Sequence, residues 1–347
     1  MPVTPRPEPQ EAAERKGRIP PEAALESGWK PAMRRLALSI ASCSLAAFAT
    51  ATERPAGQVR PEPETQGPVF PIDVEMVNLT ISVRDETGKL VTDLDTDDFA
   101  VYEEGRPQTI GLFARAVEPG NEDALALDLG MLFDTSESMI KEMRFAQEAA
   151  SRFLESVPRA RDLLTVFFDH DIRVSRYDSE HQQGLLARIF EAKGGGNTAL
   201  YDAITVYVSR VADSAGRKIL VLFTDGEDST SAISLQDLLS LVRSSSVTIY
   251  PIAFTGSFAL GSNRALSSRA FLQHIADLSG GQVYAPRTSK DLPEIYDKIL
   301  DELKAQYVIG FVPNNPKRDG KYRKLRVEVK RQGLKVRARQ GYTAPND

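Results

Sequence analysis

The chain has 347 residues, of which 41% are hydrophobic and 26% are charged, and its formal net charge is −5. This profile is typical of a globular protein with room for more than one domain, and its overall charge gives no indication of specific nucleic-acid binding. A single cysteine, Cys43, and three histidines argue against a Cys/His zinc cluster and exclude a disulfide within the chain.

The N-terminal 51 residues combine a predicted disordered stretch, residues 1–32, with a secretory signal at residues 33–51. The signal has two arginines after Met33, an apolar stretch from Leu36 to Phe48 that is short for a membrane span, and an Ala-Thr-Ala cleavage motif. We therefore expect translation to start at Met33 and the protein to be exported to the periplasm, the cell envelope or the medium. The alternatives are an N-terminal anchor, a buried apolar helix, or lipoprotein processing at Cys43.

A proline-rich linker at residues 52–71 precedes a predicted β-rich module at residues 72–120. Within this module, apolar residues alternate with polar ones along residues 74–83, so that Val77, Leu79, Ile81 and Val83 share one face. Glycine-containing turns follow at residues 85–88 and 103–107.

Residues 124–305 alternate apolar strands with helices, a pattern that predicts a Rossmann-like, doubly wound α/β domain with a parallel sheet. The strands are expected at residues 126–133, 162–168, 218–224, 247–254 and 281–285. The helices are expected at residues 140–157, 184–192, 200–214, 234–244, 270–279 and 290–306.

The last segment, residues 306–347, is predicted to be a basic antiparallel β extension. Lysines and arginines at residues 317–339 alternate with apolar residues such as Leu325 and Val327, which places the cations on the outer face. Such a basic ribbon could contact an anionic surface. The alternative is a charged edge that discourages strand pairing with other chains.

Oxygen-bearing side chains gather where three of these segments end. Asp134, Ser136 and Ser138 follow the first strand of the α/β domain, Thr198 follows a triple glycine, and Asp225 follows the third strand. In open α/β sheets, ligands bind beyond the carboxyl ends of the strands. Carboxylates and hydroxyls without soft donors favour a hard cation, Mg²⁺ first and Mn²⁺ or Ca²⁺ next. Taken singly, these residues could instead be helix N-caps or, at Asp225, a turn.

Three sequences at these positions, "DTSESM", "GGGNTALYDA" and "LFTDGEDS", resemble the metal-ion-dependent adhesion site (MIDAS) of von Willebrand factor type A domains. The resemblance implies that the ion is held by Asp134, Ser136, Ser138, Thr198 and Asp225, with one coordination position left for an acidic side chain of a protein partner. One departure is that the second loop has Gly196-Asn197-Thr198 where some adhesion receptors have Thr-x-Thr. The flanking segments resemble a secreted bacterial subgroup of the family, found mostly in acidobacterial genomes.

A binding or adhesion module without catalysis is the predicted function. The nearby acids Glu137 and Asp228 are interpreted as solvated loop residues rather than as a general base, and no GxxxxGK[ST] phosphate loop is present. The alternatives are a metal-dependent hydrolase and a structural scaffold of an envelope complex in which the metal is incidental. His170, between Asp169 and Asp171, is interpreted either as a solvent-facing turn or as part of a second cation site.

Overall fold

The computed structural model describes residues 76–116, 126–157, 160–177, 182–191, 194–214, 216–254 and 263–346. The predicted signal at residues 33–51 and the linker at residues 52–71 lie outside these residues. None of the helices in the described part of the chain combines the length and the hydrophobicity that crossing a bilayer requires.

A five-stranded sheet forms the centre of the α/β domain, with the strand order β7-β6-β5-β8-β9. The strands are β5 (Leu127–Asp134), β6 (Asp162–Phe168), β7 (Ile172–Tyr177), β8 (Arg217–Thr224) and β9 (Val247–Ala253). All pairs are parallel except β6 with β7, so the edge strand β7, which the sequence pattern did not predict, runs antiparallel. The strand expected at residues 281–285 is reduced to a single bridge between Ile252 and Tyr284.

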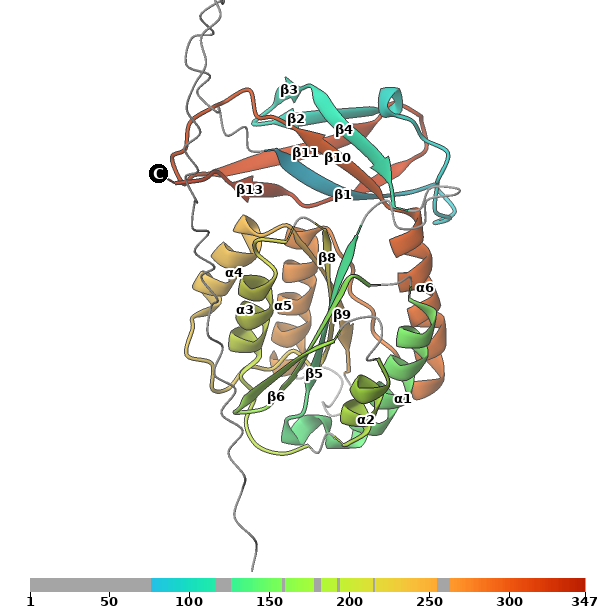
Figure 1. The fold of residues 1–347 in the computed structure, drawn as a ribbon, viewed down its shortest axis with the longest axis vertical. Coiled ribbons are helices and arrows are strands. Elements are labelled where there is room, and N and C mark those ends of the chain that lie inside the picture. Colours follow the sequence, from blue (N-terminus) through green and yellow to red (C-terminus); the bar gives the residue numbers. More distant parts are fainter. Residues whose placement is uncertain are drawn as a thin grey trace, which may run out of the picture. The chain divides into compact units, whose positions relative to one another are not determined.

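Helices cover both faces of this sheet, as the sequence predicted (Figure 1). Side chains of α1, α2 and α6 pack on one face, and those of α3, α4 and α5 pack on the other. The helices are α1 (Ile140–Ser156), α2 (Gln182–Glu191), α3 (Leu200–Arg210), α4 (Leu235–Ser244), α5 (Asn263–Ser279) and α6 (Leu292–Ala305), with short 3₁₀ helices η2 (Glu137–Met139) and η3 (Ser289–Asp291) before α1 and α6. The doubly wound α/β architecture is therefore confirmed.

Two further four-stranded antiparallel sheets combine segments from before and after the α/β domain. One has the order β12-β1-β10-β4 and the other β13-β11-β2-β3, and a shared apolar core lies between them. The strands are β1 (Val77–Arg84), β2 (Phe99–Glu103), β3 (Arg106–Gln108), β4 (Ile110–Arg115), β10 (Tyr307–Phe311), β11 (Tyr322–Val329), β12 (Lys335–Arg337) and β13 (Gly341–Thr343), with η1 (Thr96–Asp98) before β2. The α/β domain is thus inserted into a β-sandwich.

The C-terminal strands are antiparallel, as predicted, but they do not form a meander. β10 pairs with β1 and β4, β11 pairs with β2 and β13, and β12 pairs with β1, so consecutive strands belong to different sheets. The cations of this region are also not all on the outer face. Arg323 is buried against Glu103 and Tyr342, and Arg337 and Arg339 are half-buried. Alternation along a strand predicts two faces but not which of them another sheet or helix covers.

A buried carboxylate on α6 joins the α/β domain to the sandwich. Glu302 is fully buried and accepts hydrogen bonds from Ser82 Oγ (3.1 Å), Tyr250 Oη (2.7 Å) and Arg84 Nη2 (2.9 Å). It also contacts Arg337 of β12. Two guanidinium groups and two hydroxyls therefore compensate the burial of this charge.

Candidate metal centre

The two predicted acidic ligands come from neighbouring parallel strands. β5 pairs with β8 in register from Leu127 and Arg217 to Phe133 and Phe223. Asp134 is the last residue of β5 and Asp225 follows directly after β8, so both carboxylates leave the sheet at the same edge. Both residues are buried, with 1% and 3% of their surface exposed.

The first loop holds Asp134 with both of its oxygens engaged. Oδ1 accepts the backbone N–H of Ser136 at 3.0 Å, and Oδ2 accepts the hydroxyl of Thr224 at 2.6 Å. The hydroxyls of Ser136 and Ser138 lie 3.1 Å apart. The 3₁₀ helix η2 has Ser136 at its N-cap without a side-chain capping bond, and α1 has Met139 there. Helix capping therefore does not account for these hydroxyls.

The glycine loop packs directly on this first loop. Gly195 N–H donates to the carbonyl of Thr135 (2.7 Å), and Glu137 N–H donates to the carbonyl of Gly196 (3.2 Å). Gly196 has a φ of +83°, and a Cβ atom there would lie 3.0 Å from Nδ1 of His170. The positive φ and the close contact explain the glycine at this position.

Thr198 is connected to the third loop rather than to the start of α3. Its N–H donates to Ser229 Oγ (2.9 Å), and its carbonyl accepts the N–H groups of Ser229 and Thr230. The N-cap of α3 is Ala199, so Thr198 is not the cap residue that its sequence position allowed. Thr198 is also buried. The described contacts thus fasten all three oxygen-bearing loops to one another.

Asp225 has one carboxylate oxygen that is bound and one that is not. Oδ1 accepts the N–H of Glu227 at 3.0 Å. Oδ2 is buried and has no hydrogen-bond partner among the described residues. A buried anionic oxygen without a partner is unfavourable, and a cation is the partner that would compensate it. The donor set of carboxylates and hydroxyls therefore fits a hard divalent ion.

The electrostatics of Asp134 are also unusual. Burial raises the pKa of Asp134 to about 7, although hydrogen bonds from Ser136 and Thr224 act in the opposite direction, and the nearby charge of Asp225 raises the pKa further. Two buried acids in proximity favour protonation of one of them or binding of a cation between them.

Asp169, His170 and Asp171 form a second group of ligand atoms within 4.8 Å of one another, in the turn between β6 and β7. The Asp169 carboxylate is already bound by Arg173 Nη2 (2.8 Å), Thr135 Oγ1 (3.0 Å) and the Asp171 N–H (2.8 Å). Burial favours a higher pKa for Asp169, but these hydrogen bonds lower it below its ordinary value. Asp169 therefore supports the first loop through Thr135.

The sequence pattern missed three residues that orient the candidate ligands: Thr224, Asp169 and Ser229. Thr224 directly precedes Asp225 in "LFTDG", which is the only local signal for any of them. Of the two loop acids, Asp228 accepts the N–H of Tyr201 (3.1 Å) and the hydroxyl of Ser231 (2.5 Å), so it stabilises the first turn of α3, whereas Glu137 is exposed.

Comparison with known proteins places the family match on the α/β domain. The family model described as "von Willebrand factor type A domain" matches residues 128–298. No curated protein sequence matches the chain. Among solved structures, a von Willebrand factor type A protein from Catenulispora acidiphila has 14% identity and a TM-score of 0.44, covering 80% of this chain and 76% of its own.

Two other solved structures resemble part of the chain. The pilus adhesin SpaC from Lactobacillus rhamnosus GG has 8% identity and a TM-score of 0.47, covering 75% of this chain and 49% of its own. Proximal thread matrix protein 1 from the mussel byssus, with a zinc-occupied MIDAS motif, has 19% identity and a TM-score of 0.41, covering 53% of this chain and 47% of its own. The chain thus spans about half the length of each.

Proposed function

Residues 128–298 form a von Willebrand factor type A domain, and from this premise we propose that the chain is a metal-dependent protein-binding or adhesion module. The observation that carries the proposal is the buried Oδ2 of Asp225, which has no hydrogen-bond partner among the described residues although it lies in a cluster of oxygen donors. A cation at this edge of the sheet would compensate that oxygen and the neighbouring Asp134.

We propose that the ion is Mg²⁺, with Mn²⁺ or Ca²⁺ as alternatives, and that it is held by Asp134, Ser136, Ser138, Thr198 and Asp225. When bound, the ion supplies positive charge that attracts an acidic side chain of a protein partner. The chain's own residues set the geometry beforehand: Thr224 and the Ser136 N–H fix the carboxylate of Asp134, and Ser229 fixes Thr198.

The contacts of Asp228 support binding rather than catalysis. A hydrolase would need a general base beside the ion. Asp228 is engaged by Tyr201 and Ser231 at the start of α3 and is thus committed to that helix. Turnover of phosphate or peptide substrates that disappears in Asp134→Ala would instead establish a hydrolase.

We propose that this binding takes place outside the cytoplasm, in the periplasm, at the envelope or in the medium. The support is the leader pattern at residues 33–51. N-terminal sequencing of the mature protein tests it: a mature chain that still contains residues 33–51 would contradict cleavage after Ala51.

Titration calorimetry with Mg²⁺, Mn²⁺ and Ca²⁺ tests the metal site directly. In Asp225→Asn, the affinity should fall by more than about tenfold, since even residues that only support metal ligands typically contribute that much. Asp297→Asn is the matched control, because it removes an exposed acid on α6 that belongs to neither group of candidate ligands, and it should bind the ion like the unchanged chain. Unchanged affinity in Asp225→Asn would contradict the assignment.

Affinity capture with and without Mg²⁺ tests the bridging role. A partner retained with Mg²⁺ should be lost with EDTA and in Asp134→Ala, and substitution of one acidic residue of that partner should abolish retention. A partner retained equally by Asp134→Ala would support the scaffold alternative, in which the metal is incidental.

A further inference from the structure

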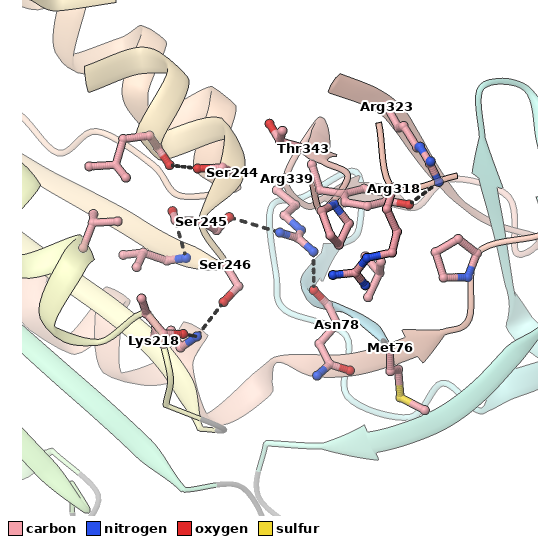
Figure 2. Close-up of a pocket in the computed structure, with 18 of the residues that line it drawn as sticks. Met76, Asn78, Lys218, Ser244, Ser245, Ser246, Arg318, Arg323, Arg339 and Thr343 are labelled. Atoms are coloured by element: carbon pink, nitrogen blue, oxygen red, sulfur yellow. Dashed lines mark hydrogen bonds between the residues drawn. The ribbon is translucent and has the colours of Figure 1, made fainter. Parts of the chain in front are cut away.

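A second candidate site lies at the opposite end of the central sheet from the metal centre. A cavity of about 810 Å³ is lined by residues from the beginnings of β8 and β9, from the end of α4 and from the β-sandwich. Figure 2 shows Lys218, Ser244–Ser246, Arg339 and Asn78 around it. Its volume is within the range of small-molecule sites in proteins.

The charged side chains that line this cavity are all basic. Five of its lining residues are basic and none is acidic: Lys218, Lys317, Arg318, Arg323 and Arg339. Arg323 is compensated by Glu103 and Asp319, at 3.4 Å and 3.7 Å. Within the described residues, Lys218 and Arg339 form no ion pair with a carboxylate. The cavity therefore favours a negatively charged ligand.

Arg339 is held in place but retains an unused donor. Its Nη1 donates to the Ser245 carbonyl (3.0 Å), and its Nη2 donates to the Asn78 carbonyl (2.9 Å). Its Nε is buried and has no hydrogen-bond partner among the described residues. Burial lowers the pKa of Arg339 to about 10, which still leaves the guanidinium charged at neutral pH. Two neutral carbonyls thus orient this cation without compensating its charge.

Lys218 approaches the same chain segment from the sheet. Its Nζ donates to the Ala212 carbonyl (2.8 Å) and to the hydroxyl of Ser246 (3.1 Å), which leaves one of its three N–H groups for another acceptor. Arg339 binds the Ser245 carbonyl and Lys218 binds the Ser246 hydroxyl, so both cations contact the same two-residue segment (Figure 2).

Apolar side chains line another part of the cavity. Met76 and Val312 are both lining residues, and 40% and 43% of their surfaces are exposed. Four more apolar residues line the cavity, Pro313 and Pro316 from the segment after β10, and Val208 and Leu241 from α3 and α4. A ligand that satisfies both parts must be anionic at one end and apolar at the other.

We propose that this cavity binds a small amphiphilic anion, with its carboxylate or phosphate group near Arg339 and Lys218 and its apolar part against Met76 and Val312. This site is independent of the metal centre, so EDTA should not affect it. The bonds from Arg339 to the Ser245 carbonyl and from Lys218 to the Ala212 carbonyl also stabilise the ends of α4 and α3, and the bond to the Asn78 carbonyl holds β1. This structural role alone leaves the Arg339 Nε without a partner among the described residues.

Titration calorimetry of the full chain with four probes tests the proposal. Octyl phosphate and octanoate should bind saturably, and the tighter of the two identifies the preferred headgroup. Octyl glucoside has the same alkyl chain without charge and should bind more weakly than both, and inorganic phosphate, which lacks the chain, should also bind more weakly. Equal binding of octyl glucoside or of inorganic phosphate, or no saturable binding of either amphiphile, would overturn the proposal.

Two variants locate the binding. Arg339→Met should weaken octyl phosphate binding, but it also removes two hydrogen bonds, so its fold must be checked by circular dichroism. Met76→Glu changes an exposed side chain and places an acid at the cavity, which should weaken binding by about tenfold or more through charge repulsion. Lys335→Met, at an exposed residue outside the cavity, should leave affinity unchanged. Normal binding in Met76→Glu would refute the assignment of this cavity.

Discussion

The affinity of the proposed metal centre for Mg²⁺ should depend on pH through Asp134. Burial raises the pKa of this carboxyl from its ordinary 3.8 to about 7, so the metal-free protein holds a proton there under mildly acidic conditions. A carboxylate must lose its proton to ligate a metal. We therefore expect the affinity to rise with pH up to about pH 7 and to be constant above pH 8.

The size of the effect follows from that pKa. Relative to pH 8, protonation of Asp134 should weaken Mg²⁺ binding about twofold at pH 7, about tenfold at pH 6 and about 100-fold at pH 5. The same raised pKa means that the metal-free protein loses stability as pH rises from about 4 to about 7, by about 4 kcal/mol in total. Mg²⁺ should therefore stabilise the fold more at pH 8 than at pH 5.

Titration calorimetry between pH 5 and pH 8, repeated in two buffers with different heats of ionisation, measures both the affinity and the protons released on binding. About one proton should be released at pH 5 and almost none at pH 8. Thr224→Val removes a hydrogen bond that lowers the pKa of Asp134, so the variant's transition should move to higher pH. A constant affinity over this range, with no proton release, would refute the reasoning.

Two further predictions concern the loops and the link to the sandwich. Gly196→Ala should destabilise the protein by about 1–3 kcal/mol and weaken Mg²⁺ binding, because φ at this residue is +83° and the new Cβ would contact His170. Gly195→Ala is the control: open space surrounds Gly195, so this change should affect stability and Mg²⁺ affinity little. Denaturant unfolding and calorimetry distinguish the two variants, and equal effects would contradict the explanation. Glu302→Ala should cost about 3–5 kcal/mol in unfolding free energy, because it leaves Arg84 and Arg337 without their buried carboxylate and the Tyr250 hydroxyl without the acceptor of its proton. A loss below about 1 kcal/mol would show that the network is unimportant.

Local sequence patterns were sufficient to predict most of the elements of the α/β domain. The predicted range of β6, residues 162–168, is the observed one. The observed ranges of α1 and α4 differ from the predicted ranges by no more than one residue at either end. The edge strand β7 was missed because its six residues alternate weakly and follow a short turn. The pairing of β1 with β10 and of β2 with β11 could not be predicted either, since it joins residues more than 200 positions apart and depends on long-range packing.

In the candidate site, too, the sequence predicts some features and leaves others unpredicted. That the loops carrying Asp134 and Asp225 share one edge follows from the rule that parallel strands end together. The supporting contacts do not follow from it: Thr224 reaches Asp134 across 90 positions, and Thr135 reaches Asp169 across 34. The cap interpretation of Ser136 was locally reasonable, yet the turn conformation directs its hydroxyl toward Ser138 instead of a helix N–H.

Strand β8 sets the positions of both proposed sites, because Lys218 at its start lines the anion cavity and Thr224 at its end orients Asp134. Between them, Leu220 and Leu222 face α3–α5, while Ile219, Val221 and Phe223 face α1 and α6, so a shift of one residue would exchange the two faces. At about 3.3 Å per residue, Lys218 and Asp225 are roughly 23 Å apart.

At that separation, with no shared contact, the two sites should act independently, and ligand effects should add within about 0.5 kcal/mol. Octyl phosphate affinity should therefore be the same, within about twofold, in EDTA and in saturating Mg²⁺, and Asp225→Asn should not change it. Coupling in this measurement would mean that β8 moves relative to β5 when either ligand binds, because β8 is the strand that contributes to both sites. That outcome would mean that the sheet has two arrangements with different affinities for the two ligands. The register of β8 against β5 would then have to be measured in both ligand states.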